Sequence, residues 1–193
     1  MSEMHAPTPR PSSIAAKWPN GFEVLDTCHV ATLAALADLE ALVGRLPDGP
    51  PDDAMRASAA RVIAFFTTTA RQHHEDEERH VLPKMATSDD PEIVQAALRL
   101  HQDHDWLEED WMELSPHLDA IAGGQSWYDV DLLREGTEVF TALSRDHIAL
   151  EEACIYPEAR ARLGDRERRE MDREMAARRA HRSASKGKRS TPP

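Results

Sequence analysis

The chain has 193 residues, of which 40% are hydrophobic and 30% charged, and its formal net charge is −12 at pH 7. This length suits one compact domain plus a tail, and no apolar run approaches the roughly eighteen residues of a membrane span. An acidic protein disfavours nucleic acid as a partner and attracts cations. The two cysteines, Cys28 and Cys154, are too few for a disulfide framework and favour a reducing, cytoplasmic setting.

The two ends of the chain differ in composition from its middle. Residues 1–19, with their prolines and serines, are expected to form a flexible N-terminal lead-in. From Arg160 onward, 12 basic residues stand against 5 acidic ones. We expect a charged C-terminal helix over 164–182, on the surface or extending past the rest of the fold, and a disordered basic tail over 183–193.

Between these ends the composition and the hydrophobic periodicity predict an all-α fold. Only eight glycines occur, Ala, Leu, Glu and Arg are abundant, and apolar residues recur at three- and four-residue steps. The predicted helices cover 20–46, 53–86, 91–122 and 129–163. Proline and glycine end them, and Asp52 or Asp53 and then Asp90 can cap the next helix. Four such helices with short connections indicate an antiparallel up-down-up-down bundle over residues 20–163.

A polar motif occurs twice in these helices. HHEDEERHVLP begins at His73 and HIALEEACIYP at His147, and in both Glu-Glu follows the first His by four and five residues and Pro by ten. A spacing of four places two side chains on one helix face, so His73 pairs with Glu77 and His147 with Glu151. His73 is preferred to His74 because only His73 reproduces the register of the second copy.

The other two helices each add one imidazole, from His29 and His104. In an antiparallel bundle all six groups lie at about the same depth. A lone core His is usually hydrogen-bonded, but six such residues on four helices favour a metal site, because cations offset the cost of buried carboxylates. Two bridging Glu and two His per metal would give the ligand mix of non-haem iron, which zinc and manganese also accept.

The set H…HxxxE…H…HxxxE resembles the hemerythrin-like, or HHE cation-binding, family. The resemblance covers about residues 20–163, and the doubled HxxxEE with its following proline is its most specific part. It implies a four-helix bundle with two carboxylate-bridged iron ions. The implied metal ligands are His29, His73, Glu77, His104, His147 and Glu151.

The chain departs from the pattern of the oxygen-carrying hemerythrins. Those proteins place HxxxH on the third helix and HxxxxD on the fourth, whereas this chain has HxxxE on the fourth and has His101 and His104 three residues apart. The resemblance therefore does not imply reversible O2 carriage. His101 remains a candidate for an additional nitrogen ligand.

Several neighbours are expected to have other roles. His80 follows Glu77 by three residues, as in the ferritin-type ligand pair, but Cys154 holds this register in the second copy, so His80 stays an alternative. Glu78 and Glu152 are expected to face solvent or to orient a His. The residues expected to take no part are His74, Glu75 and Asp76, facing solvent, and Tyr156, which packs.

Three functions are compatible with such a centre. The first is a redox-active di-iron protein that binds or reacts with O2, nitric oxide or hydrogen peroxide, in sensing or in stress defence, with peroxidase- or catalase-like activity left open. The second is a non-enzymatic protein for iron buffering, donation or iron-centre repair. The third is a scaffold that metals only stabilise. We expect a monomer or homodimer with no membrane partner and an unidentified electron donor.

Overall fold

The computed structural model describes residues 19–46 and 50–189, with side chains described as far as Arg182. Within these ranges the chain is helical and contains no strand, which confirms the all-α prediction. Most of the expected N-terminal lead-in lies outside the described residues.

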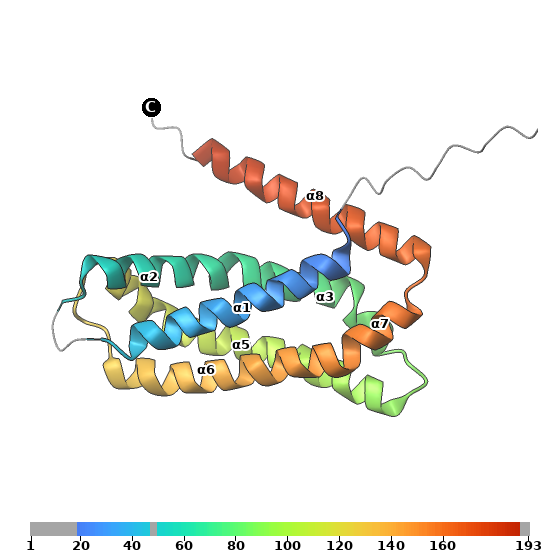
Figure 1. Cartoon of the computed structure of the whole chain (residues 1–193), viewed down its shortest axis with the longest axis horizontal. Coiled ribbons are helices and arrows are strands. Elements are labelled where there is room, and N and C mark those ends of the chain that lie inside the picture. The colour runs from blue at the N-terminus through green and yellow to red at the C-terminus, as the bar shows by residue number, and fades with distance from the viewer. Residues whose placement is uncertain (1–18, 47–49, 190–193) are drawn as a thin grey trace, which may run out of the picture.

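Four long helical segments form the bundle, and all four match their predicted ranges closely (Figure 1). The first is α1 (Gly21–Val43) and the third is α5 (Pro91–Ala122). The second consists of α2 (Asp53–Ala64), a π-helical segment η1 (Phe65–Ala70), α3 (Arg71–His80) and α4 (Leu82–Met85). The fourth consists of α6 (Val130–Leu150), a second π-helical segment η2 (Glu151–Ile155) and α7 (Tyr156–Arg162).

Aspartate and asparagine side chains begin the bundle helices, as the sequence predicts for two of them. Asp52 Oδ1 accepts a hydrogen bond from the Met55 amide at 2.8 Å, and Asp90 Oδ1 accepts one from the Glu92 amide at 2.9 Å. Asn20 does the same for α1. Such caps satisfy backbone donors that the helix leaves free, and each contributes about 1 kcal/mol.

Two apolar cores fill the bundle, and a polar layer separates them. One core lies toward the α1–α2 connection and includes Leu36, Phe66, Trp111 and Phe140. The other lies toward the α4–α5 connection and includes Leu25, Met85, Leu100 and Ile155. The residues between them along each helix are the predicted metal ligands. Because the side chains of both flanking cores are buried and apolar, they separate the polar layer from solvent at both ends of the bundle.

The two segments that carry the HxxxEE motifs are irregular next to the polar layer. Pro83 and Pro157 lack a backbone N–H and cannot continue an α-helical ladder. The chain bends at Val81, where φ is −110°, and forms the π-helical segment η2 before Pro157. The prolines of the repeat therefore mark two local changes of helix geometry close to the predicted ligands.

A fifth helix, α8 (Asp165–Arg189), crosses the bundle beside α1 and α3 (Figure 1). It is more closely attached than its charged sequence suggests, because Met171 and Met175 are each 1% exposed within the second core. Asp172 accepts a hydrogen bond from the Gly21 amide at 2.6 Å. The expected end of this helix at residue 182 is wrong, since α8 continues to Arg189; residues 190–193 lie outside the described chain.

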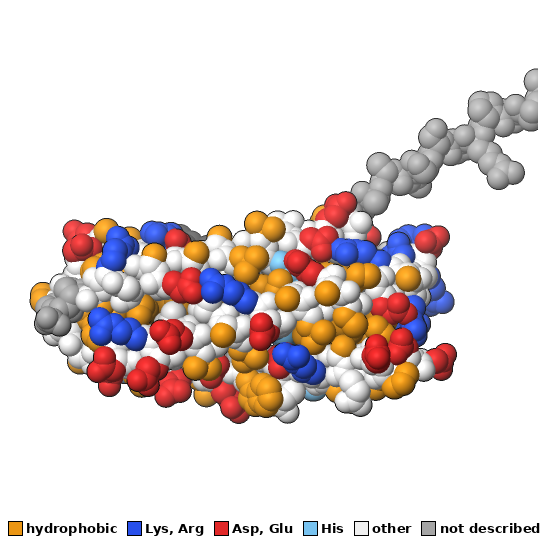
Figure 2. Space-filling model, turned by 60° about the horizontal axis from the view of Figure 1, so that its bottom comes forward, with side chains coloured by type: hydrophobic (Ala, Val, Ile, Leu, Met, Phe, Trp, Pro, Cys, Tyr) orange, Lys and Arg blue, Asp and Glu red, His pale blue; other side chains and the backbone are white. Residues whose placement is uncertain are grey.

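Acidic and basic side chains alternate over the face shown in Figure 2, with small apolar patches between them and little histidine visible. This agrees with the burial of most histidines of the polar layer. Among the described helices, none has the length and apolar character needed to cross a membrane.

Candidate metal centre

The six predicted ligands lie together in the middle of the bundle. Each is between 0% and 4% exposed. α1 supplies His29, α3 supplies His73 and Glu77, α5 supplies His104, α6 supplies His147, and η2 begins with Glu151. The sequence therefore predicted correctly which side chains the four helices bring to one depth.

These side chains form two overlapping groups, in each of which the donor atoms lie within 4.8 Å of one another. We call the first group, His29, His73, Glu77 and Glu151, the α1/α3 position. We call the second, Glu77, His104, His147 and Glu151, the α5/α6 position. Both carboxylates belong to both groups, which is the arrangement needed for two bridging ligands.

Glu77 faces one imidazole of each position. Its Oε2 lies 3.4 Å from Nε2 of His73 and 3.5 Å from Nε2 of His104. Glu77 is fully buried, so its charge is costly without a cation or a full set of hydrogen bonds.

Glu151 repeats this relationship with the other two imidazoles. Its Oε2 lies 3.0 Å from Nε2 of His29, and its Oε1 lies 3.2 Å from Nε2 of His147. All four imidazoles therefore turn Nε2 toward the two carboxylates. This shared direction is the one expected if cations lie between the imidazoles and the carboxylates.

The opposite ring nitrogens of three imidazoles face carboxylates. Nδ1 of His29 lies 3.0 Å from Glu152 Oε1, and Nδ1 of His104 lies 3.0 Å from Glu78 Oε1. A carboxylate that accepts from Nδ1–H leaves the Nε2 lone pair available for a metal and fixes the ring orientation. Glu78 and Glu152 were expected to face solvent or to orient a His, and they are partly exposed, at 40% and 56%, while each contacts one imidazole.

The third of these imidazoles is His147, and the fourth imidazole of the centre, His73, lacks such a carboxylate partner. Asp103, which precedes His104, lies 3.6 Å from Nδ1 of His147 and is 1% exposed. Cys28 holds the matching place before His29. Nδ1 of His73 is buried and forms no hydrogen bond with any described residue. Burial raises the pKa of the Cys28 thiol to about 12, so this side chain is a neutral core group.

The electrostatics of the metal-free layer are those of imidazoles sharing protons with carboxylates. Burial acts to lower the pKa of His147, but the nearby carboxylates of Glu151, Asp103 and Glu77 together outweigh it and raise the pKa to about 10. For His29 the nearby carboxylates of Glu151, Glu152 and Glu77 together likewise outweigh burial, and its pKa is raised. Burial dominates at His73 and lowers its pKa to about 4.

Several donor atoms of the layer have no hydrogen-bond partner among the described residues. They are Glu77 Oε2, both Glu151 oxygens and Nε2 of His104 and of His147. Buried polar atoms are seldom left without a partner, because each costs about 1–3 kcal/mol. Oxygen and nitrogen donors of this kind suit a divalent or trivalent cation of the first transition row. The residues therefore fit two metal ions.

Tyr156 is part of the centre as well as of the core. Its hydroxyl donates to Glu77 Oε1 at 2.5 Å and lies 3.1 Å from Nε2 of His29. Its ring stacks on His29 with the centroids 5.1 Å apart. The expectation of a simple packing role is thus too narrow. Leu82 holds this register in the first copy of the repeat, so the repeat gave no signal for it.

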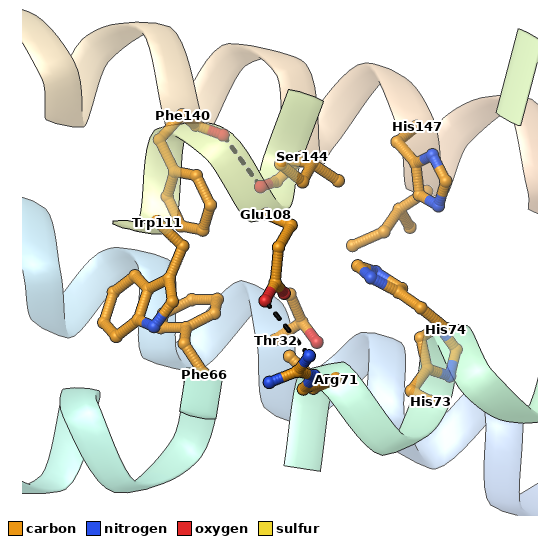
Figure 3. Close-up of a pocket in the computed structure, with 13 residues that line it drawn as sticks. Thr32, Phe66, Arg71, His73, His74, Glu108, Trp111, Phe140, Ser144 and His147 are labelled. Carbon is orange, nitrogen blue, oxygen red and sulfur yellow. Dashed lines mark hydrogen bonds and ion pairs between the residues drawn. The ribbon is translucent and has the colours of Figure 1, made fainter. Parts of the chain in front are cut away.

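A small cavity adjoins the centre. It has a volume of about 40 Å3 and is lined by apolar side chains such as Leu107 and Phe140 and by imidazoles of both positions. Figure 3 shows His147, His74 and His73 at one side of this cavity and Trp111, Phe66 and Phe140 at the other. An ion pair between Arg71 and Glu108, 3.3 Å apart, joins α3 to α5 beside it.

The two less certain histidines lie outside the centre. The side chain of His101 is 62% exposed, and its Nδ1 lies 3.6 Å from Glu78, because a three-residue step turns it away from the stripe of His104. Nε2 of His80 lies 3.5 Å from Glu174 of α8. Neither belongs to a group of potential metal ligands among the described residues.

Two residues expected to face solvent do not. Asp76 is fully buried and accepts hydrogen bonds from Arg178 and, at 2.7 Å, from Arg179 of α8. His74 is half-buried, and its ring stacks on His104 with the centroids 4.1 Å apart. The repeat could not indicate either, since its second copy has Leu150 and Ile148 at these registers.

An antiparallel helical bundle with four imidazoles and two carboxylates in its middle defines a helical metal-binding protein. The family model described as the hemerythrin HHE cation binding domain matches residues 20–159, and the chain belongs to this family. No curated protein shows significant similarity to the chain.

Proposed function

We propose that the protein is a cytoplasmic non-haem di-iron protein whose centre binds or reacts with a small ligand, namely O2, nitric oxide or hydrogen peroxide, in redox sensing or stress defence. The observation that carries this proposal is the cavity beside the shared carboxylates. It reaches imidazoles of both positions, so a molecule inside it lies next to the metals.

The size of the cavity limits the ligand. A volume of about 40 Å3 is a few times the roughly 10–15 Å3 that a cavity needs to hold one water, so the space suits one or a few small molecules. Diatomic molecules and peroxide are of this size, whereas organic substrates are not. Apolar residues such as Leu107, Trp111 and Phe140 line much of the wall, which suits weakly polar ligands.

Iron supplies the chemistry that such ligands need, because it changes oxidation state at ligand sets of imidazole and carboxylate. The protein's own contribution is to hold four imidazoles and two carboxylates in place and to exclude bulk water. Zinc and manganese accept the same donors, so iron content has to be measured rather than assigned from the ligands.

The burial of the ligands bears on the alternative of iron buffering or donation. A donor protein has to release its metal readily, and ligands between 0% and 4% exposed favour retention. The two functions predict different behaviour toward chelators. Di-iron protein that keeps its metal in the presence of a competing chelator supports the first, and rapid loss to the chelator supports the second.

The test is to purify the protein from cells supplied with iron, determine its metal content, and record absorption spectra with azide, nitric oxide and peroxide. We expect two iron ions per chain and near-ultraviolet charge-transfer bands that change with these ligands. The double substitution His147→Ala, Glu151→Ala should abolish both, while His80→Ala, outside the centre, should leave them unchanged. The absence of transition metal, or a spectrum that none of the ligands changes, would overturn the proposal.

A further inference from the structure

We infer that the ion pair between Arg71 and Glu108 is the entrance of the cavity and determines which small molecules reach the centre from solvent. The two side chains come from α3 and α5, lie 3.3 Å apart and both line the cavity. This role rests on the proposed function, because it names the route by which the small ligand arrives. Neither residue belongs to a group of potential metal ligands among the described residues.

The wall of the cavity meets solvent where α3 and α5 lie next to each other. Among the described residues that line it, all are buried except Arg71, His74 and Glu108. The side chain of Arg71 is 58% exposed and that of Glu108 is 43% exposed. Thr32 of α1 and Ser144 of α6, which line the cavity from the other two helical segments, are buried. A molecule from solvent therefore meets the cavity at the seam between α3 and α5.

Two neighbouring contacts close this seam. The ring of His74 stacks on that of His104 with the centroids 4.1 Å apart. Arg71 precedes His74 by three residues and Glu108 follows His104 by four, so the ion pair lies one helical turn from the stacked rings. Figure 3 shows the pair between the imidazoles at one side of the cavity and the aromatic side chains at the other. Of the two contacts, the ion pair is the one with both side chains largely in solvent.

The ion pair can open easily, whereas the rest of the wall cannot. An exposed pair of long side chains favours its closed form by no more than about fivefold, because water solvates the separated charges well. Exposed side chains also change rotamer within picoseconds to nanoseconds. Trp111 and Phe140 are packed in the apolar core and have no free space to move into. Small molecules therefore enter when the pair separates, and the volume of about 40 Å3 behind it excludes larger ones.

The two charges also select among small molecules. The closed pair is neutral overall, so it neither attracts nor repels O2, nitric oxide or hydrogen peroxide. An anion is attracted by Arg71 and repelled by Glu108. Loss of either partner should therefore admit neutral molecules equally, while the charge that remains should decide how fast an anion enters.

The first experiment measures entry into the metal-free protein through the fluorescence of Trp111, which lines the cavity and is 8% exposed. Phenylalanine replaces the other three tryptophans, Trp18, Trp106 and Trp127. We expect Arg71→Ala and Glu108→Ala to raise the bimolecular constant for quenching of Trp111 by dissolved O2 about two- to fivefold. Glu108→Gln keeps the size of the side chain and should have the same effect, because it removes the charge.

Glu40→Ala is the matched control. It removes an ion pair with Arg145 that joins α1 to α6 and has similar exposure, 41% and 50%, but neither residue lines the cavity. Its quenching constant should equal that of the parent, and far-ultraviolet circular dichroism should show that all variants fold. Quenching constants equal to the parent value in both Arg71→Ala and Glu108→Ala would overturn the inference. Faster quenching in Glu108→Ala but not in Glu108→Gln would also overturn it, because bulk rather than the ion pair would then close the seam.

The second experiment follows nitric oxide binding to the iron-loaded protein by stopped-flow absorption. An entrance changes the association and dissociation rates by one factor and leaves Kd unchanged, so both rates should rise in Arg71→Ala and Glu108→Ala as quenching does. Azide should associate faster in Glu108→Ala than in Arg71→Ala, and added salt should reduce this difference. A changed Kd for nitric oxide, or equal azide rates in the two variants, would overturn selection by the pair. If the protein holds no iron, the proposed function fails, while the quenching of Trp111 still decides whether the pair is the entrance.

Discussion

Glu78 Oε1 lies 3.0 Å from Nδ1 of His104, and the repeat reproduces this contact between Glu152 and His29. Each HxxxEE motif therefore supplies one carboxylate to the centre and a second one that holds an imidazole of a neighbouring helix. The hydrogen bond with His104 holds the pKa of Glu78 below its ordinary value, so it is ionised at neutral pH.

We expect Glu78→Ala to weaken metal binding at the α5/α6 position and Glu152→Ala to weaken it at the α1/α3 position. The physical reason is that an imidazole without its carboxylate partner is less basic and free to rotate, which costs about 10–100-fold in metal affinity. Competition with a chromophoric chelator measures the loss. Asp105→Ala, at an exposed residue next to His104, is the control and should have no effect. Equal affinities in all three variants would contradict the orienting role.

Tyr156→Phe should destabilise the metal-free protein more than the metal-loaded protein. Without metal, the hydroxyl donates to buried Glu77, and its removal leaves an oxygen without a partner at a cost of about 1–3 kcal/mol. A bound cation takes over that interaction, so the difference in unfolding free energy should shrink on loading. Urea denaturation with and without metal measures it. Tyr128→Phe, in the other core, should have the same effect in both states, and an equal penalty for Tyr156→Phe in both states would argue against this role.

Features that depend on local sequence could be predicted, whereas features that depend on tertiary contacts could not. Helix ranges were predictable because local residues such as Asp52, Asp90 and Pro91 determine where helices begin. The grouping of the six candidate ligands was predictable because two copies of one motif and two matching single histidines lie at one depth. Tertiary contacts without a local signature were not: the two buried methionines of α8 stand four residues apart in a charged sequence and are easily overlooked.

Repetition also misled the prediction at two positions next to the centre. His74 and Tyr156 both lie where the other copy has a hydrocarbon side chain, so comparing the copies classifies them as unimportant. Their roles become visible only when the four helices place them next to His104 and Glu77. A repeat therefore indicates what two half-sites share and conceals what distinguishes them.

Metal uptake should release protons, and metal affinity should rise with pH through the neutral range. In the metal-free protein the pKa of His147 is raised to about 10, and those of His29 and His104 are also raised, so protons compete with metal below these values. Burial alone would raise the pKa of Glu151, but His147 and its other neighbours, including His29, together lower it well below its ordinary value, so this carboxylate contributes no proton. Calorimetry of Zn2+ binding at pH 7 in buffers of different ionisation enthalpy should show at least about one proton released per chain. Heats that do not depend on the buffer would contradict the prediction.

Asp76→Ala should destabilise the protein by about 2–4 kcal/mol, because it removes the fully buried partner of Arg178 and Arg179 and so detaches α8 from α3. The estimate is below the usual cost of breaking a buried ion pair, since the two arginine side chains are 17% and 32% exposed and can reach solvent. Glu75→Ala is the matched control one residue earlier. The side chains of Glu75 and its partner Arg182 are 34% and 43% exposed, so their ion pair should contribute less than about 1 kcal/mol. Urea denaturation of both variants decides the matter, and similar losses for the two would show that the Asp76 contacts do not hold α8 in place.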